Sequence, residues 1–249
     1  MKSYISEIFS SIQGEGPYIG ERHLFLRFCD CHRDCIYCDT NTKRTESVMI
    51  EKVAGSGEIE HIPNPLSVDE VLNWIDVLDA KKNNKRISLT GGAPLLQAKF
   101  LSQLLPKLVE KGYSNYLETV GDLTDQFKTI VEYIDIVAMD VKLSSVTLDK
   151  NIFSQHWEFL SYMKNQNVKY FIKLIVSNET DECELMEAVR GICKHGGKET
   201  NVILQALSAT ERVSNTPSSQ QLLRWQDKIV NVLPNIRVIP QTHKIMGVL

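Results

Sequence analysis

The sequence predicts an α/β fold in which a mostly parallel sheet is covered by outer helices. Apolar, β-branched runs alternate with amphipathic stretches along the chain, which is typical of repeated βα units. A length of 249 residues suits one domain of this class, since α/β barrels commonly reach this size without dividing. The most unusual polar residues follow the apolar runs, where a parallel barrel places its active site.

Seven apolar runs are expected to form strands. They are short, rich in β-branched and aromatic residues, and separated by stretches long enough for a helix. The expected strands are residues 24–28, 86–89, 115–118, 134–139, 169–176, 201–204 and 236–239.

The stretches between these strands are expected to be helices. The clearest begins at Ser67, because Ser67 and Glu70 match a capping box ahead of an apolar face. The others are residues 99–110, 125–133, 155–165, 181–195 and 218–233. Pro106 lies inside the first of these and is expected to kink or restart the helix. Residues 41–65 are expected to be one long irregular connection, a kind of loop that is often functional.

The composition is that of an ordinary globular protein, with 43% hydrophobic and 24% charged residues. A net charge of −3 gives no electrostatic footprint for nucleic acid, so a small-molecule substrate is expected. The N-terminus has no apolar signal region, and no stretch has the ~18 apolar residues of a membrane span. A cytoplasmic protein is expected. Its six cysteines indicate metal chemistry rather than disulfides, and Cys183 and Cys193 are expected to pack in the core.

Polar or glycine-rich segments follow six of the seven expected strands. In a parallel barrel the carboxyl ends of the strands converge on one face, so these segments are expected to lie together. In chain order they are the cysteine-rich loop, Thr90-Gly91-Gly92, Glu118-Thr119, Asp140 with Lys142, Gln205, and Gln241-Thr242-His243.

The cysteine-rich loop carries a C-x3-C-x2-C triplet, Cys31, Cys35 and Cys38. Three thiolates on one short loop can bind three irons of a 4Fe-4S cluster and leave the fourth iron without a protein ligand. Cys29 could complete a set of four for iron or zinc, but it continues the alternation of the first strand, so a non-ligand role is expected. A structural zinc site favours two separate C-x2-C pairs, which this chain lacks, and zinc or unliganded thiols remain as alternatives.

This loop, with the aromatic Tyr37 just before its third cysteine, resembles that of the radical S-adenosylmethionine (radical SAM) enzymes. The resemblance implies a partial (βα)6-type barrel and a 4Fe-4S cluster whose open iron binds S-adenosylmethionine, which is cleaved to a 5′-deoxyadenosyl radical. Thr90-Gly91-Gly92-Ala93-Pro94 resembles the glycine-rich segment of that family, where glycines permit a close approach to the cofactor. Ala93 stands where the family usually has Glu, so one expected polar support of the cofactor is missing.

Segments at both ends of the chain resemble one family of radical SAM enzymes, the 7-carboxy-7-deazaguanine synthases of queuosine biosynthesis. The segments are Glu7-Ile8-Phe9, Ile12-Gln13-Gly14-Glu15-Gly16, Arg27, Cys38-Asp39-Thr40 and Pro240-Gln241-Thr242-His243-Lys244. The resemblance spans nearly the whole chain. It implies a lyase that contracts the ring of 6-carboxy-5,6,7,8-tetrahydropterin to 7-carboxy-7-deazaguanine and releases ammonia.

The resemblance also implies roles for individual residues, most of them binding roles. Beyond the cluster and the cofactor, no catalytic residue is expected. The cluster ligands would be Cys31, Cys35 and Cys38, and Thr40 would bind Mg²⁺. S-adenosylmethionine would be bound by Tyr37, Asp39, Gly91, Gly92, Glu118, Thr119, Asp140, Lys142 and Gln205. The pterin would be bound by Ile12, Gln13, Gly14, Glu15, Arg27, Thr90, Gln241, His243 and Lys244.

Structural alternatives stay open for several of these residues. Arg27 could form an ion pair instead of binding an anionic group, Asp140 could pair with Lys142, and Thr40 could cap a helix. The expected organisation is one domain, with residues 1–22 as a substrate-binding extension, 23–240 as the barrel and 241–249 as a segment that closes the site.

Two other functions remain open from the sequence. A glycyl-radical-enzyme activase is also small and uses this cysteine spacing, although it lacks the terminal segments quoted above. A non-catalytic iron–sulfur or zinc-binding module would be consistent with Ala93. The expected partners of the enzyme are the pterin, a reductant such as flavodoxin or ferredoxin, and a second copy in a homodimer, with no nucleic acid and no membrane.

Overall fold

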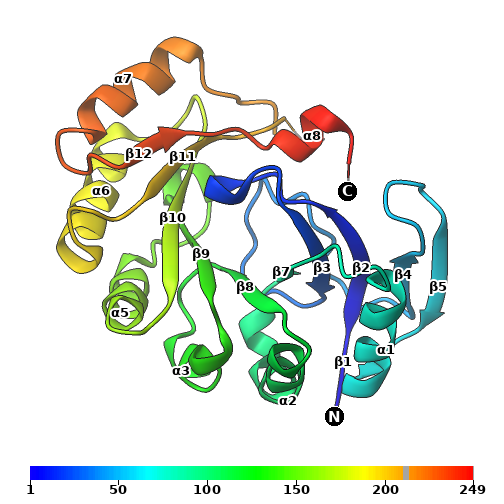
Figure 1. The fold of residues 1–249 in the computed structure, drawn as a ribbon. Helices are drawn as coiled ribbons and strands as arrows, with labels where there is room; N and C mark the ends of the chain where they lie inside the picture. Colours follow the sequence, from blue (N-terminus) through cyan, green and yellow to red (C-terminus); the bar gives the residue numbers. More distant parts are fainter. Residues whose placement is uncertain (210–212, 249) are drawn as a thin grey trace.

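The computed structural model describes residues 1–209 and 213–248, and it confirms the predicted α/β fold (Figure 1). In this part of the chain one ten-stranded sheet has the order β12-β11-β10-β9-β8-β7-β3-β2-β4-β5. Its strands are β2 (Ile5–Ile12), β3 (Arg22–Phe28), β4 (Ser47–Glu51), β5 (Ile59–Pro63), β7 (Arg86–Gly91), β8 (Ser114–Thr119), β9 (Ile136–Val141), β10 (Lys169–Val176), β11 (Val202–Ala206) and β12 (Ile236–Val238). A separate pair joins β1 (Lys2–Ser3) to β6 (Leu66–Ser67).

The parallel part of the sheet runs from β12 to β3 and contains all seven predicted strands. Beyond it, β2 is antiparallel to β3, β4 is parallel to β2, and β5 is antiparallel to β4. Within the described residues the pairing order ends at β12 and β5, so the sheet curves into a partial barrel that does not close.

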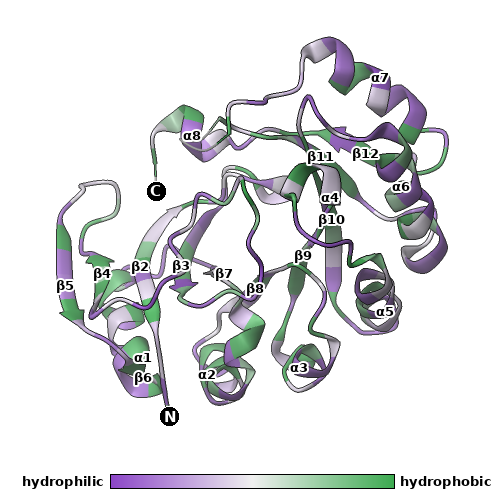
Figure 2. Ribbon diagram, turned by 180° about the vertical axis from the view of Figure 1, so that it is seen from behind, coloured by the Kyte–Doolittle hydropathy of each residue, from purple (hydrophilic) through white to green (hydrophobic). Residues whose placement is uncertain are grey.

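Helices cover the outer face of the curved sheet and form an arc around it (Figure 1). They are α1 (Val68–Leu78), α2 (Ala98–Glu110), α3 (Thr124–Lys128), α5 (Phe153–Lys164), α6 (Glu182–Gly196) and α7 (Ser219–Ile229), with short helices α4 (Ser144–Thr147) and α8 (Thr242–Met246) near the strand ends. Figure 2 shows green and purple residues alternating along the outer helices, as expected for amphipathic helices that bury one face. No helix within residues 1–209 or 213–248 is long and apolar enough to cross a membrane.

The predicted capping box of α1 is confirmed. Ser67 Oγ accepts from the Glu70 backbone N–H at 3.3 Å, and the Glu70 carboxylate accepts from the Ser67 N–H at 2.7 Å. The helix buries Val71 and Ile75 completely against the sheet. The sequence signal and the packing therefore agree on where this helix begins and which face it buries.

The inner face of the barrel has an apolar layer and a polar layer. Tyr116, Ile136, Ala138, Phe171 and Ile203 form a buried cluster that Tyr18 and Ile239 cover. Because side chains alternate along a strand, the residue two positions later faces the same way. Those later positions carry polar side chains on four neighbouring strands: Glu118, Asp140, Lys173 and Gln205. The polar layer lies at the carboxyl ends, above an apolar floor.

Two expectations about connections were wrong. Residues 41–65 contain the hairpin of β4 and β5, in which Val48 and Ile50 are fully buried and Gly55 and Gly57 adopt positive φ in the turn. Strand β2 was not predicted, although it pairs with both β3 and β4. The polar residues in Ile5–Ile12 interrupt its apolar character because the strand lies beside an antiparallel neighbour rather than deep in the parallel core.

Expected helices differ from the structure at three points. The expected helix 125–133 breaks after Lys128, where the Thr129 hydroxyl donates to the Gln126 carbonyl at 2.7 Å and competes with helix bonding. The expected helix 218–233 ends at Ile229, and Asn231 Nδ2 donates to the Asp227 carbonyl at 2.8 Å. Helix α2 runs through Pro106 without restarting.

The expectation that Cys183 packs in the core was wrong, whereas Cys193 does pack against it. Helix α6 buries Leu185, Ala188 and Val189. Cys183 lies two residues before Leu185, which places it about 200° around the helix and therefore on the solvent side.

Candidate active site

Two adjoining cavities open at the polar layer of the barrel. The first has a volume of about 170 Å³ and is lined by the cysteine loop and the carboxyl ends of the strands. The second has a volume of about 250 Å³ and is lined by segments from both ends of the chain. Six residues line both cavities: Glu15, Asp39, Thr40, Thr90, Glu118 and Gln241.

The cysteine loop begins where β3 ends. The Cys29 N–H donates to the Tyr4 carbonyl at 3.1 Å, which continues the pairing of the strand, and the Cys29 side chain is fully buried. Asp30 then adopts positive φ, which turns the chain out of the sheet. Cys31, Cys35 and Cys38 all line the first cavity, whereas Cys29 lines neither cavity.

The three cavity cysteines fit a cluster that is bound through three separate irons. Cys35 is 8% exposed and Cys38 is exposed, so the loop spans from the interior to the surface. Within the described residues, no three His, Cys, Asp or Glu side chains converge closely enough to hold a single metal ion. A 4Fe-4S cluster needs no such convergence, because each thiolate binds a different iron. Burial raises the pKa of the Cys31 and Cys35 thiols, and metal binding would displace their protons.

The glycine-rich segment at the end of β7 packs directly against the start of the cysteine loop. Gly91 has φ +101°, and a Cβ atom there would overlap the backbone of Phe28. A Cβ atom on Gly92 would overlap the carbonyl oxygen of Asp30. Ala93 donates its N–H to that same carbonyl at 2.8 Å, but its own side chain lines neither cavity. Both glycines are therefore needed for close packing as well as for access to a ligand.

A chain of alternating charges crosses the floor of the first cavity. Lys142 Nζ lies 3.2 Å from the Tyr37 hydroxyl and 3.0 Å from Asp140 Oδ2. Lys173 Nζ lies 3.1 Å from Asp140 Oδ1 and 2.6 Å from Glu15 Oε2. We refer to Tyr37, Lys142, Asp140, Lys173 and Glu15 as the ionic chain.

The electrostatics of the ionic chain keep its four charged groups ionised. Burial by itself would raise the pKa of Glu15 and Asp140, but the neighbouring ammonium groups hold both values below the ordinary range. Burial likewise disfavours charged Lys142 and Lys173, yet the carboxylates hold both pKa values well above the usual one. Each buried charge is therefore compensated by a neighbour of opposite sign.

Glu118 behaves differently from the carboxylates of the ionic chain. It accepts a hydrogen bond from the Thr90 hydroxyl at 2.8 Å and faces both cavities. Burial raises its pKa, and the nearby charges of Glu15 and Asp140 add to this effect while Lys173 opposes it. A carboxyl group in this setting is more easily protonated than an ordinary glutamate and could then donate a hydrogen bond to a ligand.

The second cavity depends on contacts between the loop that follows β2 and the C-terminal segment around α8, which lie side by side (Figure 1). Thr242 donates its backbone N–H to the Gly14 carbonyl at 2.9 Å and its hydroxyl to the same oxygen at 3.1 Å. A Cβ atom on Gly14 would overlap His243. Glu15 accepts from Gln241 Nε2 at 2.6 Å. The absence of a side chain at Gly14 is what lets the C-terminal segment lie against the N-terminal loop.

Three charged residues on the walls of this cavity, Glu15, Arg27 and Asp39, are already in ion pairs. Arg27 Nη1 lies 2.5 Å from Glu7 Oε2, so the predicted alternative of an ion pair is present, and Arg27 still lines the cavity. Lys244 Nζ lies 2.6 Å from Asp39 Oδ2. The alternative of an ion pair between Asp140 and Lys142 is present as well.

Four buried side-chain atoms of the cavity-lining residues have no hydrogen-bond partner in the described residues: Gln13 Nε2, Gln205 Oε1, Arg33 Nε and Asp140 Oδ1, the last of which lies 3.1 Å from Lys173 Nζ. Gln13 is 2% exposed, and its Oε1 accepts from the Glu15 N–H at 3.0 Å while its Nε2 has no partner in the described residues. Gln205 is 2% exposed, and its Nε2 donates to Glu15 Oε1 at 3.2 Å while its own Oε1 has no partner there. An unpaired buried amide atom is costly, so both atoms fit contacts to bound ligands.

The structure brings together every residue that the sequence nominated for the site, since each lines one or both cavities. Sequence reasoning missed Lys173, which lines the first cavity, and Phe25, which lines the second. The signal for Lys173 was available: it is the single charged residue inside the otherwise apolar run Tyr170–Val176. Leu249, the last residue of the predicted closing segment, lies outside the described residues.

Comparisons with known proteins agree with this geometry. The family model described as "Radical SAM superfamily" matches residues 27–198. The chain is 34% identical to the 7-carboxy-7-deazaguanine synthase of Geobacter sulfurreducens, over 98% of this chain and 96% of the relative. It is 31% identical to the enzyme of that name from Methanocaldococcus jannaschii, over 98% of this chain and 100% of the relative. The crystal structure of QueE from Escherichia coli has a similar fold, with a TM-score of 0.60 at 18% identity over 97% of this chain and 94% of that one.

Proposed function

Because the chain belongs to the radical SAM superfamily and, within it, to the 7-carboxy-7-deazaguanine synthases, we propose that it performs the ring contraction of 6-carboxy-5,6,7,8-tetrahydropterin. The product is 7-carboxy-7-deazaguanine and the leaving group is ammonia, so the enzyme is a radical SAM lyase of 7-deazapurine biosynthesis. The observation that carries this proposal is the pair of adjoining cavities, one lined by three cysteines and the other by both ends of the chain.

The first cavity is assigned to the 4Fe-4S cluster and S-adenosylmethionine. Once bound and reduced, this pair supplies a 5′-deoxyadenosyl radical that abstracts a hydrogen atom from the substrate. The chain contributes thiolates from Cys31, Cys35 and Cys38, and Gln205 offers an unpaired buried acceptor for the amine or hydroxyl groups of the cofactor.

The second cavity is assigned to the pterin. Gln13 Nε2 is an unpaired buried donor for a ring nitrogen or carbonyl, and Glu118 faces the junction of the two cavities. Arg27 is suited to the substrate carboxylate, since a guanidinium has further N–H donors besides the one used by Glu7. The C-terminal residues Gln241 and His243 close this cavity against the N-terminal loop.

We also propose that Thr40 binds a magnesium ion that contacts the substrate. Thr40 lines both cavities, so an ion beside its hydroxyl would lie between the cofactor and the pterin. Magnesium usually keeps several waters and binds substrate oxygens, so the Thr40 hydroxyl would supply one ligand of a shell that these oxygens complete.

Further proposals concern the setting of the enzyme. Cys38 is exposed, so a one-electron donor such as flavodoxin or ferredoxin could reach the cluster from that side. An iron–sulfur cluster on free thiols suits the reducing cytoplasm. The edge strand β5 has an exposed apolar residue, Ile59, which would be covered in a homodimer. We propose that residues 1–22, 23–240 and 241–249 of one domain serve as the substrate-binding extension, the barrel and the segment that closes the site.

The test uses anaerobically reconstituted protein with dithionite, S-adenosylmethionine, magnesium and 6-carboxy-5,6,7,8-tetrahydropterin. The expected products are 7-carboxy-7-deazaguanine and ammonia, with 5′-deoxyadenosine detected as evidence of cofactor cleavage. Substantial 5′-deoxyadenosine without any deazapurine would refute the substrate and favour another radical reaction. A reduced cluster whose electron paramagnetic resonance spectrum does not respond to S-adenosylmethionine would favour a non-catalytic cluster protein.

A further inference from the structure

Lys173 is a buried charge for which the proposed reaction gives no role. It lies in the middle of β10 and is 4% exposed, between Phe171 and Ile175 on the same face of the strand. An ammonium group in a central strand is stable only where carboxylates compensate it closely. Its two carboxylate partners come from opposite sides of the site.

On the substrate side, Lys173 Nζ forms an ion pair with Glu15 Oε2 at 2.6 Å. The other oxygen of Glu15 accepts from Gln205 Nε2 at 3.2 Å and from Gln241 Nε2 at 2.6 Å. One carboxylate therefore connects the N-terminal loop, strands β10 and β11, and the C-terminal segment. Since both oxygens are engaged, Glu15 is occupied in holding these segments together.

On the cofactor side, Lys173 Nζ lies 3.1 Å from Asp140 Oδ1, and Asp140 Oδ2 lies 3.0 Å from Lys142 Nζ. Lys142 reaches the hydroxyl of Tyr37, which is the residue before the third cysteine of the loop. The ionic chain thus runs without a break from the cysteine loop to the closing segment of the substrate cavity, and Lys173 is its central member.

The balance of charge makes that central position important. The ionic chain contains two ammonium groups and two carboxylates, all in the buried floor of the site. Without Lys173, Glu15 and Asp140 would share a buried region with Lys142 alone and would repel each other. Relief of that repulsion requires movement of the N-terminal loop, of β9 or of both.

We propose that Lys173 is a positioning residue that holds the cofactor side and the substrate side of the site in register, acting through Asp140 and Glu15. This inference rests on the proposed function for the identity of the two ligands. Lys173 lines the first cavity but not the second, so the loss of pterin binding on its removal has to pass through Glu15.

The experiment measures binding without turnover, using holoenzyme with the cluster oxidised so that S-adenosylmethionine is not cleaved. Calorimetry gives the dissociation constants of S-adenosylmethionine and of 6-carboxy-5,6,7,8-tetrahydropterin separately. In Lys173→Met, both dissociation constants are expected to rise roughly 3- to 30-fold, while iron and sulfide content stays at the wild-type level. Lys173→Arg keeps the charge and is expected to recover part of both losses.

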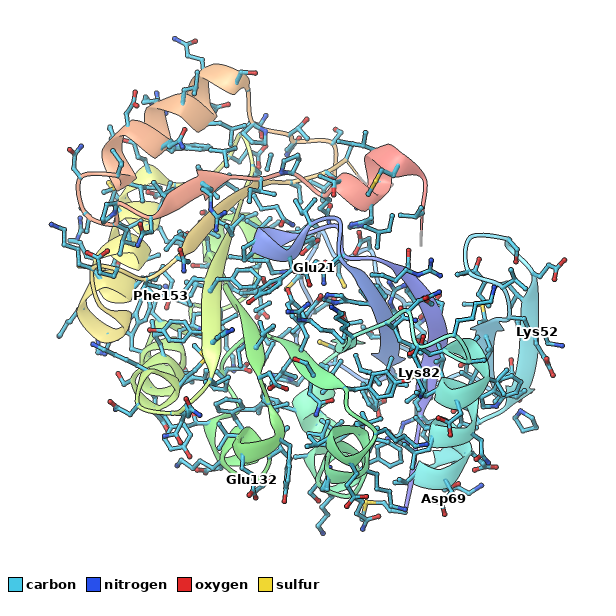
Figure 3. The ribbon with its side chains drawn as sticks, in the orientation of Figure 1. Glu21, Lys52, Asp69, Lys82, Glu132 and Phe153 are labelled. Carbon is cyan, nitrogen blue, oxygen red and sulfur yellow. The ribbon has the colours of Figure 1, made fainter. Side chains whose placement is uncertain are left out.

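Two matched variants identify the origin of the effect. Arg27→Met removes a guanidinium that lines the second cavity alone and lies outside the ionic chain, so it is expected to raise the dissociation constant of the pterin only. Arg86, at the amino end of β7, forms an ion pair with Glu21, which is labelled in Figure 3. Arg86→Met removes this cation and is expected to leave the dissociation constants of both ligands unchanged. A general loss of stability would not produce this pattern across the three variants.

The inference is overturned if Lys173→Met binds both ligands like the wild type, or if it weakens only one of them. Should Lys173→Met fail to fold, Asp140→Asn decides: it keeps the shape of the side chain, removes one charge of the ionic chain and lines the first cavity alone, so it must weaken the pterin as well as S-adenosylmethionine. If the wild-type holoenzyme binds S-adenosylmethionine but not the pterin, the proposed function fails, and the inference fails with it. Normal binding of both ligands by the wild type and by the variants refutes the inference alone.

Discussion

The two cavities of the site are built from the chain in different ways. The first is assembled from a single cysteine loop and from strand ends that the parallel topology brings together. Glu15, Gln241 and Lys244 also reach the first cavity, but the second depends on the contact between Gly14 and Thr242, which are 228 positions apart. The first cavity therefore follows from local motifs and topology. The second exists only while the two ends of the chain remain in contact.

The substitutions with the largest expected effect disrupt the first cavity without affecting the second. Replacement of Cys31, Cys35 or Cys38 by Ala should abolish cluster assembly, since a three-thiolate site has no spare ligand. Iron and sulfide analysis with the visible absorption of anaerobically reconstituted protein measures this.

Cys29→Ala is the matched control for the cysteine prediction. Cys29 is buried at the end of β3 and lines neither cavity, so this variant should assemble the cluster at nearly the wild-type level. Loss of the cluster in Cys29→Ala, or its retention in any of the other three variants, would refute the ligand assignment.

The same contrast explains how much the sequence could predict. The seven parallel strands were predictable because their apolar runs are continuous, as buried parallel strands require. Strand β2 and the hairpin of β4 and β5 were missed because their burial alternates or their pairing is antiparallel. Lys173 could have been found as a lone charge in an apolar strand. Its partners Glu15 and Asp140 could not, since no local pattern shows which carboxylates reach it.

The substrate residues show the same limit more strongly. Nothing in the spacing of Gln13, Glu15 or Gln241 indicates that they meet. Only resemblance to a family nominated Gln13 and Glu15, whereas Gln241 was also nominated by its place after a strand. The structure shows that all three line the second cavity. The role of Gly14 was predicted as a substrate contact, and its packing against His243 became visible only in three dimensions.

The second prediction concerns a substitution that disrupts the second cavity and leaves the first intact. In Gly14→Ala the new methyl group would overlap His243 and push the C-terminal segment away from the N-terminal loop. Overpacking of this kind costs about 1–3 kcal/mol, so the pterin dissociation constant should rise by about 5- to 150-fold. Calorimetry with oxidised holoenzyme measures it, and the binding of S-adenosylmethionine should change far less. Gly20→Ala is the control for backbone strain without overlap, because Gly20 has φ +89° and a Cβ atom there meets no other atom within 4 Å. Equal effects of the two variants on pterin binding would refute the argument.

The third prediction concerns a support of the first cavity that has no equivalent in the second. His156 is fully buried, its Nε2 accepts from the Lys142 backbone N–H at 3.0 Å, and its Nδ1 donates to the Gly121 carbonyl at 3.2 Å. Burial lowers its pKa to about 4, so it stays neutral in the folded protein while the unfolded chain takes up a proton below pH ~6.5. The stability that neutral His156 contributes is present above pH ~6.5 and is lost as the pH falls towards 4.

His156→Gln removes this titration. The variant should be less stable than the wild type at pH 7, and the difference in free energy of unfolding should shrink by about 2 kcal/mol between pH 7 and pH 5. Anaerobic denaturant unfolding at both pH values measures the difference. His61→Gln, at an exposed position in β5, serves as the control. A difference for His156→Gln that stays constant with pH would show that His156 is not held neutral by its burial.

The smallest expected effect concerns Ala93, at the edge of the first cavity. Its neighbours Gly92 and Pro94 line that cavity, so a longer side chain at position 93 could reach the ammonium group of bound S-adenosylmethionine. A charge-assisted hydrogen bond would be gained, but Ala93 is only 6% exposed, so a carboxylate at this position would also lose hydration, and these two effects largely cancel. Ala93→Glu should therefore lower the dissociation constant of S-adenosylmethionine by only about two- to fivefold and leave that of the pterin unchanged. Ala93→Gln adds the same bulk without the charge, so it should lower the dissociation constant of S-adenosylmethionine by less. Weaker cofactor binding in Ala93→Glu would mean that close packing against Asp30 leaves no room for the acid, and that this chain binds its cofactor without a carboxylate at that position.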